Sequence, residues 1–257
     1  MAYIEINDVS KVYQRVGEPF HALSHVSLEI ERGEFICLLG PSGCGKTTLL
    51  NTLAGFEHPD EGQVLIGGEK VKDPVPNRAT IFQHYGLLPW QTVEKNVMLG
   101  LLAKKIPKEQ ARAAAAKYID LVGLAGFEHV RPAQLSGGMQ QRVSIARGLA
   151  VQPDVLFMDE PFAALDAITR LKMQDDIHRI AEEEGVTVVF VTHDIEEAVA
   201  LADRIVVLTP NPGRVKEIIK VELGPDRLRT ADDFLAVRDH VFDVFGMKPN
   251  WNVEYVI

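Results

Sequence analysis

The chain has 257 residues, of which 46% are hydrophobic and 25% are charged, which is typical of a globular protein able to bury a sizeable core. Its formal net charge of −9 argues against a general nucleic-acid binder, because phosphate backbones are held by a surplus of Lys and Arg. No apolar run approaches the ~20 residues that span a bilayer, and none follows a basic N-terminus as in a signal peptide, so any membrane crossing is expected from another chain.

Strand patterns dominate the N-terminal part of the chain. Residues 45–54 predict a helix with Gly55 as its stop, and apolar or alternating runs before and after it predict strands. The run FICLL at residues 35–39 is apolar throughout, as expected of a strand covered on both faces. The predicted strands are YIEINDV, VSLEI, EFICLLG, QVLIGG and ATIFQ.

From about residue 86 to residue 150 the patterns are helical. A short helix is predicted at residues 92–99, and a second begins near Pro107 and stops at Gly123. Ser136 is a candidate N-cap for a third helix that runs to about Ala150. This segment interrupts the strands and is expected to form a helical insert.

The strand pattern resumes with VLFMDE and continues through VTVVFV and RIVVL. Helices are predicted at residues 167–184 and from Asp194 onward, where Glu197 three residues later fits a capping box. Strands that alternate with helices predict a parallel α/β sheet. The last ~35 residues hold one predicted helix, residues 231–245, and are too few for a further domain.

The stretch GPSGCGKT matches the phosphate-loop pattern G-x-x-x-x-G-K-[ST], and it stands between a buried strand and a helix as that loop requires. Its glycines let successive N–H groups face phosphate oxygens, Lys46 adds a positive charge, and the Thr47 hydroxyl is a Mg²⁺ ligand. The correctly spaced Lys46 and Thr47 argue against a plain glycine-rich turn. The candidate nucleotide-binding residues are Gly40, Pro41, Ser42, Gly43, Cys44, Gly45, Lys46, Thr47 and Thr48.

Cys37 and Cys44 are the only cysteines, too few for a disulfide framework, which favours reduced thiols in a cytosolic compartment. Because Cys44 lies inside the phosphate loop, alkylation of its thiol is expected to block nucleotide binding, and ATP is expected to protect it.

Two carboxylates follow the apolar strand in VLFMDEP. Ligands of open α/β sheets sit beyond the carboxyl ends of the strands, so Asp159 is placed to hold a metal ion and Glu160 to act as general base. Alone, such a pair could equally well end a strand. Beside a phosphate loop the catalytic interpretation is favoured.

Three further side chains are candidates on position alone. His193 ends the VTVVFVTH strand and could reach a γ-phosphate, or it could support only the Asp194 cap. Gln83 follows ATIF and could reach metal or water, or be a surface glutamine. Tyr13 offers an aromatic face for adenine, with Phe20 as a rival and an ordinary strand aromatic as the alternative.

A second anion site is predicted at LSGGMQQR, where Ser136, Gly137 and Gly138 expose a hydroxyl and free N–H groups at the positive end of a helix. The alternative is a capped helix with two flexible residues. The residues alone do not decide whether this site meets the chain's own nucleotide.

Together GPSGCGKTT, LSGGMQQR, VLFMDEP, AALD and VTHD resemble the ATPase subunit of an ABC transporter. The resemblance implies an α/β P-loop NTPase with a RecA-like parallel sheet, an N-terminal antiparallel β subdomain and an inserted helical subdomain. It implies one ABC domain over residues 1–257, with a nucleotide-binding core at 1–85 and 151–221, the helical subdomain at 86–150 and a C-terminal tail at 222–257.

The resemblance also implies roles for residues. It assigns adenine stacking to Tyr13, the Q-loop and metal contact to Gln83, the switch histidine to His193 and the D-loop to Asp166. It implies that two subunits pack head to tail, so that Ser136, Gly137, Gly138 and Gln140 close on ATP held by the partner. Ala164 and Met139 depart from the Ser and Gln common in the family, which puts rates in doubt but not the function.

The stretches QHYGLLPW, LDAITR, THDIEEAV and NPGRV resemble the nitrate, sulfonate and taurine importer group. That resemblance implies ATP and Mg²⁺ as ligands and a second ATPase subunit as partner. It further implies membrane permease subunits, a solute-binding protein acting through them, and a place on the cytoplasmic face of the inner membrane. Nucleic acid is not an expected partner.

Two other functions of the same ATPase class remain open. A DNA-repair or chromosome-structuring ATPase would place a long coiled coil between the phosphate loop and LSGGMQQR, and residues 48–134 show no heptads. An ATPase for lipoprotein release or cell division shares the fold, and the stretches LDAITR and NPGRV favour import over it.

Overall fold

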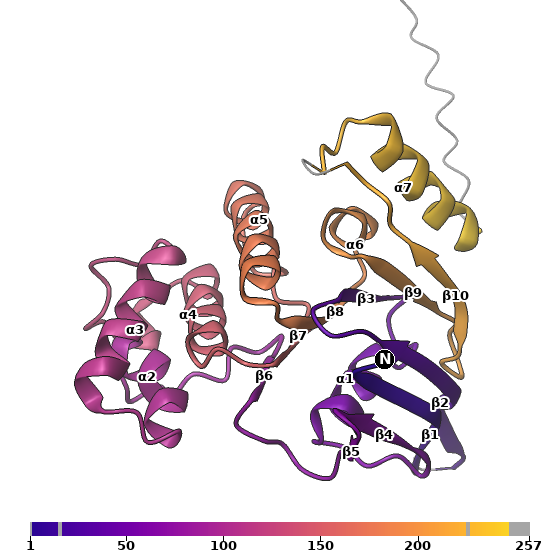
Figure 1. Cartoon of the computed structure of the whole chain (residues 1–257), viewed down its shortest axis with the longest axis horizontal. Coiled ribbons are helices and arrows are strands. Elements are labelled where there is room, and N and C mark those ends of the chain that lie inside the picture. Colours follow the sequence, from indigo (N-terminus) through magenta and orange to yellow (C-terminus); the bar gives the residue numbers. More distant parts are fainter. Residues whose placement is uncertain (1, 15–16, 225–226, 247–257) are drawn as a thin grey trace, which may run out of the picture.

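Two β-sheets and a group of helices make up the protein, whose computed structural model describes residues 2–14, 17–224 and 227–246 (Figure 1). A four-stranded antiparallel sheet has the order β2-β1-β4-β5, and a six-stranded sheet has the order β10-β9-β3-β8-β7-β6. The strands are β1 (Ile4–Gln14), β2 (Pro19–Ile30), β3 (Phe35–Leu39), β4 (Glu61–Ile66), β5 (Glu69–Lys70), β6 (Arg78–Ile81), β7 (Val155–Asp159), β8 (Thr187–Thr192), β9 (Arg204–Leu208) and β10 (Val215–Lys220).

The helices fall into three groups along the chain. In the described part of the chain, one helix follows β3, three lie between β6 and β7 with a short 3₁₀ helix (Pro132–Gln134), and three follow β7. Their bounds are α1 (Lys46–Ala54), α2 (Val93–Ala103), α3 (Lys108–Leu121), α4 (Gly137–Ala150), α5 (Ala167–Glu184), α6 (Ile195–Leu201) and α7 (Asp232–Val244).

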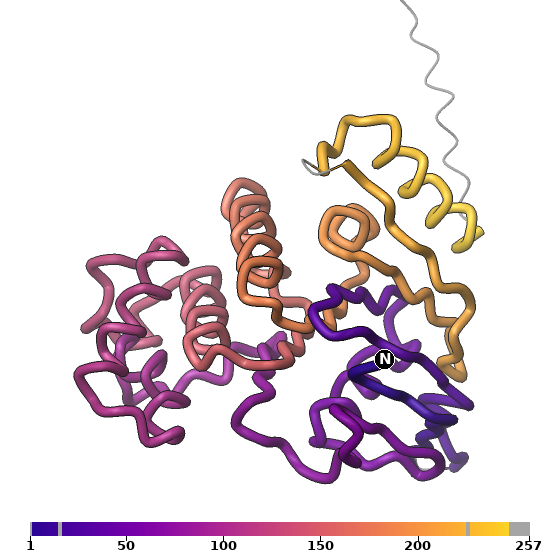
Figure 2. Tube along the Cα trace, viewed as in Figure 1, coloured from indigo at the N-terminus to yellow at the C-terminus, as the bar shows by residue number. Residues whose placement is uncertain are grey.

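The larger sheet is parallel from β9 to β6, and only β10 joins it antiparallel. Every residue of β3, β7 and β8 is buried, as expected of parallel strands that are covered on both faces. The early strand β3 lies between β8 and β9 from the last third of the chain (Figure 2). The carboxyl ends of these strands therefore meet at one edge, which is where the site residues lie.

Period-two alternation in β3 sends its side chains into two hydrophobic clusters. Ile36 and Leu38 join a cluster with Leu49 and Leu53 of α1 and with residues of β1 and β2, so α1 lies between the two sheets. Cys37 belongs instead to the cluster on the opposite face, together with residues of α4, α5 and α6. The phosphate loop therefore joins a strand and a helix that are both part of the core.

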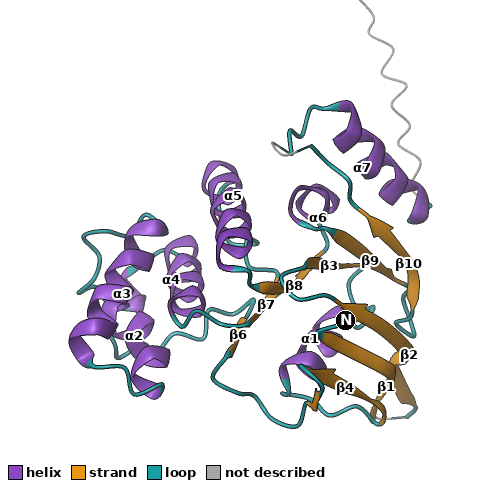
Figure 3. Cartoon of the chain, viewed as in Figure 1, coloured by secondary structure: helices purple, strands orange, loops and turns teal. Residues whose placement is uncertain are grey.

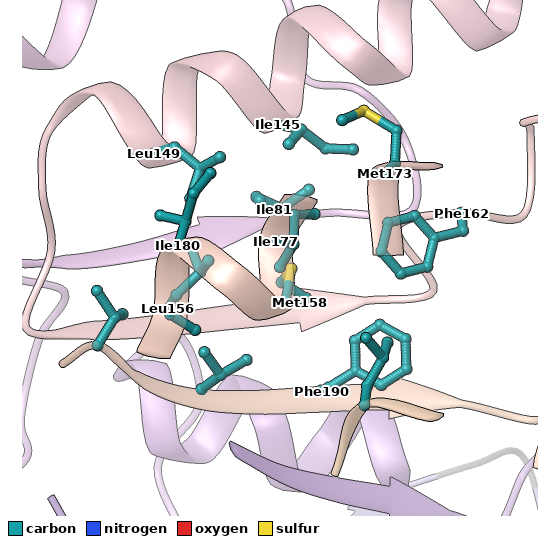
Figure 4. Packing of buried hydrophobic residues seen from close by; sticks show 14 of the residues in the cluster. Ile81, Ile145, Leu149, Leu156, Met158, Phe162, Met173, Ile177, Ile180 and Phe190 are labelled. Carbon is teal, nitrogen blue, oxygen red and sulfur yellow. The ribbon is translucent and has the colours of Figure 1, made fainter. Parts of the chain in front are cut away.

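Helices α2, α3 and α4 pack on one another and form a separate lobe beside β6 (Figure 3). Side chains of α4 and α5 meet those of β6, β7 and β8 in one apolar layer, which includes Ile145, Ile177 and Phe190 (Figure 4). A Cβ at Gly148 would lie 2.9 Å from Ile81 Cγ1, so glycine allows α4 to approach β6 closely. The C-terminal helix α7 packs on α6 through the buried Phe234.

The predicted fold class is confirmed, and the predicted helix at residues 167–184 matches α5. The helix predicted at residues 92–99 runs further, from Val93 to Ala103, with Thr92 as its N-cap. Strands β1 and β2 extend well beyond the predicted runs, and β5 and β10 were not predicted. Among the described helices, none is long and apolar enough to cross a membrane.

The predicted capping box at Asp194 is only half formed: the Asp194 side chain caps the helix, but the Glu197 side chain does not bond back to the cap. Asp194 Oδ1 accepts hydrogen bonds from the N–H groups of Glu196 and Glu197, at 2.8 and 3.2 Å, as an N-cap should. The Glu197 side chain does not turn back to the cap but lies buried, where it bonds Thr192 and Gln174. An acidic residue expected to complete a helix cap is therefore part of the interior.

Candidate functional site

The loop between β3 and α1 is shaped by glycines in the left-handed region. Gly45, the N-cap of α1, has φ +94°, and a Cβ there would lie 2.6 Å from the Ala22 carbonyl oxygen and 2.8 Å from Leu23 Cδ2. Gly43 has φ +80° with open space around its missing Cβ. The loop backbone thus needs glycine at Gly45 for two reasons, its conformation and its close approach to β2.

Lys46 is buried at the start of α1, and its ammonium group folds back over the loop. Its Nζ donates to the carbonyl oxygens of Gly40 at 2.6 Å and Pro41 at 3.1 Å. This geometry places a positive charge inside the ring of backbone that the sequence predicts to hold phosphates.

Thr47 and Asp159 form the next pair, although they are separated by more than one hundred residues in the chain. The Thr47 hydroxyl donates to the Asp159 carboxylate, with Oγ1 lying 3.0 Å from Oδ2 and 3.2 Å from Oδ1. Burial raises the pKa of Asp159, and the hydrogen bond from Thr47 opposes that shift. Two hard oxygen donors therefore meet beside the phosphate loop.

Glu160 lies between two of the other candidates. Its Oε1 is 3.0 Å from His193 Nδ1, and its Oε2 accepts a hydrogen bond from Gln83 Nε2 at 3.4 Å. The Glu160 backbone has φ +45°, a sparsely populated conformation for a residue with a side chain, and its N–H bonds the Val191 carbonyl. Such strain is found at sites that must aim a side chain in one direction.

One open pocket of about 550 Å³ is lined by most of the residues that the sequence predicts to bind or hydrolyse nucleotide. The phosphate loop forms one wall, Gln83, Glu160 and His193 form another, and Tyr13 and Phe20 contribute aromatic rings. Tyr13 and Phe20 are paired neighbours on β1 and β2, so the structure brings both rival aromatics to the pocket. The lining residues are Tyr13, Phe20, Ala22, Ser42, Gly43, Gly45, Lys46, Thr47, Thr48, Asn51, Gln83, Glu160 and His193.

The second predicted anion site lies elsewhere, at the start of α4. Ser136 is the N-cap, and its Oγ accepts a hydrogen bond from the Met139 N–H at 3.2 Å. A Cβ on Gly137 would lie 2.8 Å from the Tyr85 hydroxyl, and Gln140 Nε2 donates to the Leu135 carbonyl at 3.2 Å. Within the described part of the chain, the walls of the phosphate-loop pocket contain no residue of 135–142.

Comparison with known proteins identifies the family. The protein-family model described as ABC transporter matches residues 23–163, which is more than half of the chain. The chain belongs to the ABC transporter family.

Relatives match this ABC ATPase over nearly its whole length. MJ0412 of Methanocaldococcus jannaschii, an uncharacterized ABC transporter ATP-binding protein, is 49% identical over 94% of this chain and 90% of its own. The bicarbonate transport ATP-binding protein CmpD of Synechocystis sp. is 43% identical over 94% of this chain and 88% of its own. This ABC ATPase is accordingly an ATP-binding enzyme coupled to transport.

The fold agrees with a solved cassette as well. The dimeric post-hydrolysis structure of the ATP-binding cassette MJ0796, bound to ADP and Pi, gives a TM-score of 0.80 at 35% sequence identity. That likeness covers 86% of this chain and 100% of the solved chain. The two sheets and the helical lobe described above therefore form the fold of a solved ATP-binding cassette.

Three residues of the ABC ATPase's phosphate loop do not face the pocket. Gly40, Pro41 and Cys44 are not among the residues that line the pocket. The Cys44 side chain is fully buried in the cluster around α1, and burial raises the pKa of its thiol. The thiol expected to be open to alkylation therefore lies behind the loop, where a reagent reaches it only if the loop opens.

Asp166, assigned to the D-loop by resemblance, is the N-cap of α5. Its Oδ1 accepts a hydrogen bond from the Thr169 N–H at 3.0 Å, and such bonds lower the pKa of its carboxyl. The carboxyl is exposed and is not among the residues that line the phosphate-loop pocket.

Sequence reasoning missed Ala22 and Asn51 in the pocket of the ABC ATPase and the buried Glu197 behind it. Asn51 is one helical turn beyond Thr47 and Thr48, so helical spacing from the phosphate loop would have found it. Ala22 has no such signal, because it is the close tertiary approach of β2 to Gly45 that brings it to the loop.

Proposed function

We propose that this ABC ATPase energises the import of a small inorganic or organic anion across the inner membrane. The likeness to the bicarbonate transport protein CmpD supports an anionic solute. The resemblance of QHYGLLPW, LDAITR, THDIEEAV and NPGRV to the nitrate, sulfonate and taurine importer group adds those anions as candidates. In this proposal the chain sits on the cytoplasmic face, bound to permease subunits that receive their solute from a solute-binding protein. The transported compound contacts those partners and not the ATPase.

We further propose that two copies of the chain share two ATP molecules. Each ATP lies between the phosphate loop of one subunit and Ser136, Gly137 and Gly138 of the other. The observation that carries this proposal is that the two candidate anion sites of one chain are separate. Residues 135–142 are not among those that line the pocket around Lys46. The dimeric state of the MJ0796 cassette supports it.

The residues that line the pocket, together with Asp159 behind Thr47, fit a magnesium nucleotide. The Thr47 hydroxyl and the Asp159 carboxylate supply hard oxygen ligands of the kind that Mg²⁺ prefers, with the Gln83 amide oxygen as a third candidate. Bound there, Mg²⁺ would neutralise charge on the β- and γ-phosphates. Lys46 would exchange its carbonyl partners for phosphate oxygens, and Tyr13 would stack on the adenine.

Glu160 is the proposed general base for the attacking water. His193 and Gln83, both within hydrogen-bond reach of its carboxylate, hold that carboxylate at the pocket wall and would contact the γ-phosphate or the water. After cleavage, the lost contact between the two loops and the repulsion between the product charges would open the dimer.

The shared site is tested by two variants that separate binding from closure. Glu160→Gln should bind ATP, hydrolyse it at least about a hundredfold more slowly and accumulate as a dimer, because only the base is lost. Adding Ser136→Arg to this variant should abolish the dimer while leaving nucleotide binding to the monomer nearly intact. Ala116→Arg, on the exposed face of α3, is the matched control for the added charge and should leave the dimer intact.

Size-exclusion chromatography with light scattering, run with and without MgATP, reads the dimer, and a fluorescent ATP analogue reads binding to the monomer. Loss of monomer binding in Ser136→Arg would show that the chain's own two loops share one nucleotide. Uptake of labelled bicarbonate, nitrate and taurine by the reconstituted transporter then identifies the anion, and uptake of none of them contradicts the importer proposal.

A further inference from the structure

A chain of buried polar side chains runs from the C-terminal segment to the residue that precedes His193. Its centre is the Glu197 carboxylate on α6, which is 7% exposed. Glu197 Oε2 accepts a hydrogen bond from the Thr192 hydroxyl at 2.7 Å, and Oε1 accepts one from Gln174 Nε2 of α5 at 3.1 Å. Thr192 is 2% and Gln174 1% exposed, so the end of β8, α5 and α6 are joined away from water.

The outer end of this chain is Arg229, in the segment between β10 and α7. Its Nη2 donates to Gln174 Oε1 at 2.5 Å, which leaves the Gln174 amide nitrogen to face Glu197. Every donor along the path therefore points toward the carboxylate, and the half-buried guanidinium of Arg229 fixes that direction. Arg229 is the point at which the C-terminal segment touches the network.

The inner end of this hydrogen-bonded path holds the two residues on either side of His193. The Thr192 Oγ1 that donates to Glu197 also accepts a hydrogen bond from the Asp194 N–H at 3.0 Å. The backbone is thus pinned on both sides of His193, whose own side chain is 63% exposed and meets Glu160 Oε1 at 3.0 Å. A ring with so little packing around it takes its direction largely from the backbone that carries it.

A carboxylate at this position is costly for the fold. Burial raises the pKa of Glu197, and the hydrogen bond from Thr192 opposes this shift only in part. Asp194 raises the pKa further, whereas Arg170 and His193 lower it. An apolar residue between α5, α6 and β8 would avoid that cost, but it would hold neither the Thr192 hydroxyl nor the Gln174 amide. The buried acid is explained if it orders the backbone around His193.

We infer that Glu197, acting through Thr192, is a positioning residue for His193. Arg229 extends the same hydrogen-bonded path to the C-terminal segment. The inference rests on the proposed role of His193 in hydrolysis. It predicts that breaking the path changes the placement of the imidazole and the turnover rate, while nucleotide binding is spared because the path touches none of the phosphate loop.

The test uses the full-length chain and the matched pair Thr192→Val and Thr192→Ser. Valine keeps the shape of the strand residue but lacks the hydroxyl, whereas serine keeps the hydroxyl. Thr192→Val should lower kcat about tenfold, which is less than the roughly hundredfold or more lost with a whole catalytic group, because His193 is displaced and not removed; KM for ATP should be nearly unchanged. Thr192→Ser should stay within about twofold of the parent. The imidazole NMR signals of His193, assigned with His193→Gln, should shift in Thr192→Val and not in Thr192→Ser.

Arg229→Ala provides a second readout that leaves the strand intact. It should move the His193 signals in the same direction, whereas Arg238→Ala, an arginine of the same tail that pairs with Asp239, should not. Equal kcat and equal His193 signals in the two Thr192 variants overturn the inference while His193→Gln still lowers kcat. A His193→Gln variant with normal kcat overturns the proposed role of His193 itself, and the inference with it.

Discussion

The sharpest structural prediction concerns Gly45, because its neighbour Gly43 provides an internal control. Both residues have positive φ, so an alanine at either position costs roughly 1–2 kcal/mol in backbone strain. At Gly43 the added methyl meets nothing within 4 Å. At Gly45 it would lie 2.6 Å from the Ala22 carbonyl and 2.8 Å from Leu23 Cδ2, and forcing such an overlap costs about 1–3 kcal/mol more.

The assay is urea unfolding of the nucleotide-free protein, followed by circular dichroism. Gly43→Ala should lower the free energy of unfolding by roughly 1–2 kcal/mol and Gly45→Ala by about 2–5 kcal/mol. Omitting ATP matters, because both residues line the pocket and nucleotide would add its own contribution. Equal losses in the two variants would refute the close approach between the loop and β2.

Other features lead to further predictions. Burial lowers the pKa of His178 from 6.5, so the folded state favours the neutral ring. The stability that this ring contributes is fully present above about pH 6.5 and is lost as the pH falls below that value. The melting temperature should therefore decrease less between pH 7 and pH 5 in His178→Gln than in the parent protein. Cys44 should react with a maleimide far more slowly in the native protein than in urea, and equal rates would contradict its burial. Phe234→Ala should weaken the docking of α7 by about 3 kcal/mol. Hydrogen exchange should then speed up in α7 and not in β3.

Much of the fold could be predicted because its elements carry local signals. The run FICLL and the loop after it predict β3 and the start of α1, and Ser136 and Asp166 cap their helices as their residue types suggest. Strand β10 has no such signal, because its alternation is weak and it is held by pairing with β9. Tertiary pairing of this kind has no counterpart in a local pattern.

The candidate site divides in the same way. Strand-end position led to Gln83, Glu160 and His193, and the parallel sheet brings these three together. Capping-box spacing assigned Glu197 to the cap at Asp194, but this spacing does not reveal what packs on the other side of the helix. Only the approach of α5 to α6, which brings in Gln174, makes the residue buried.

The polar side chains around the phosphate loop are already paired with one another or with the backbone. Lys46 bonds two loop carbonyls, Thr47 bonds Asp159, and Glu160 has both His193 and Gln83 as partners. Each contact that ATP makes with these side chains must therefore replace an existing one, so the net gain per contact is a difference of about 1 kcal/mol and not a full hydrogen bond. A second protein surface that adds new contacts without breaking old ones would then decide between the open and closed states. In the proposed dimer, the N–H groups at the start of α4 would be such a surface, which would give one chain a use for two anion sites.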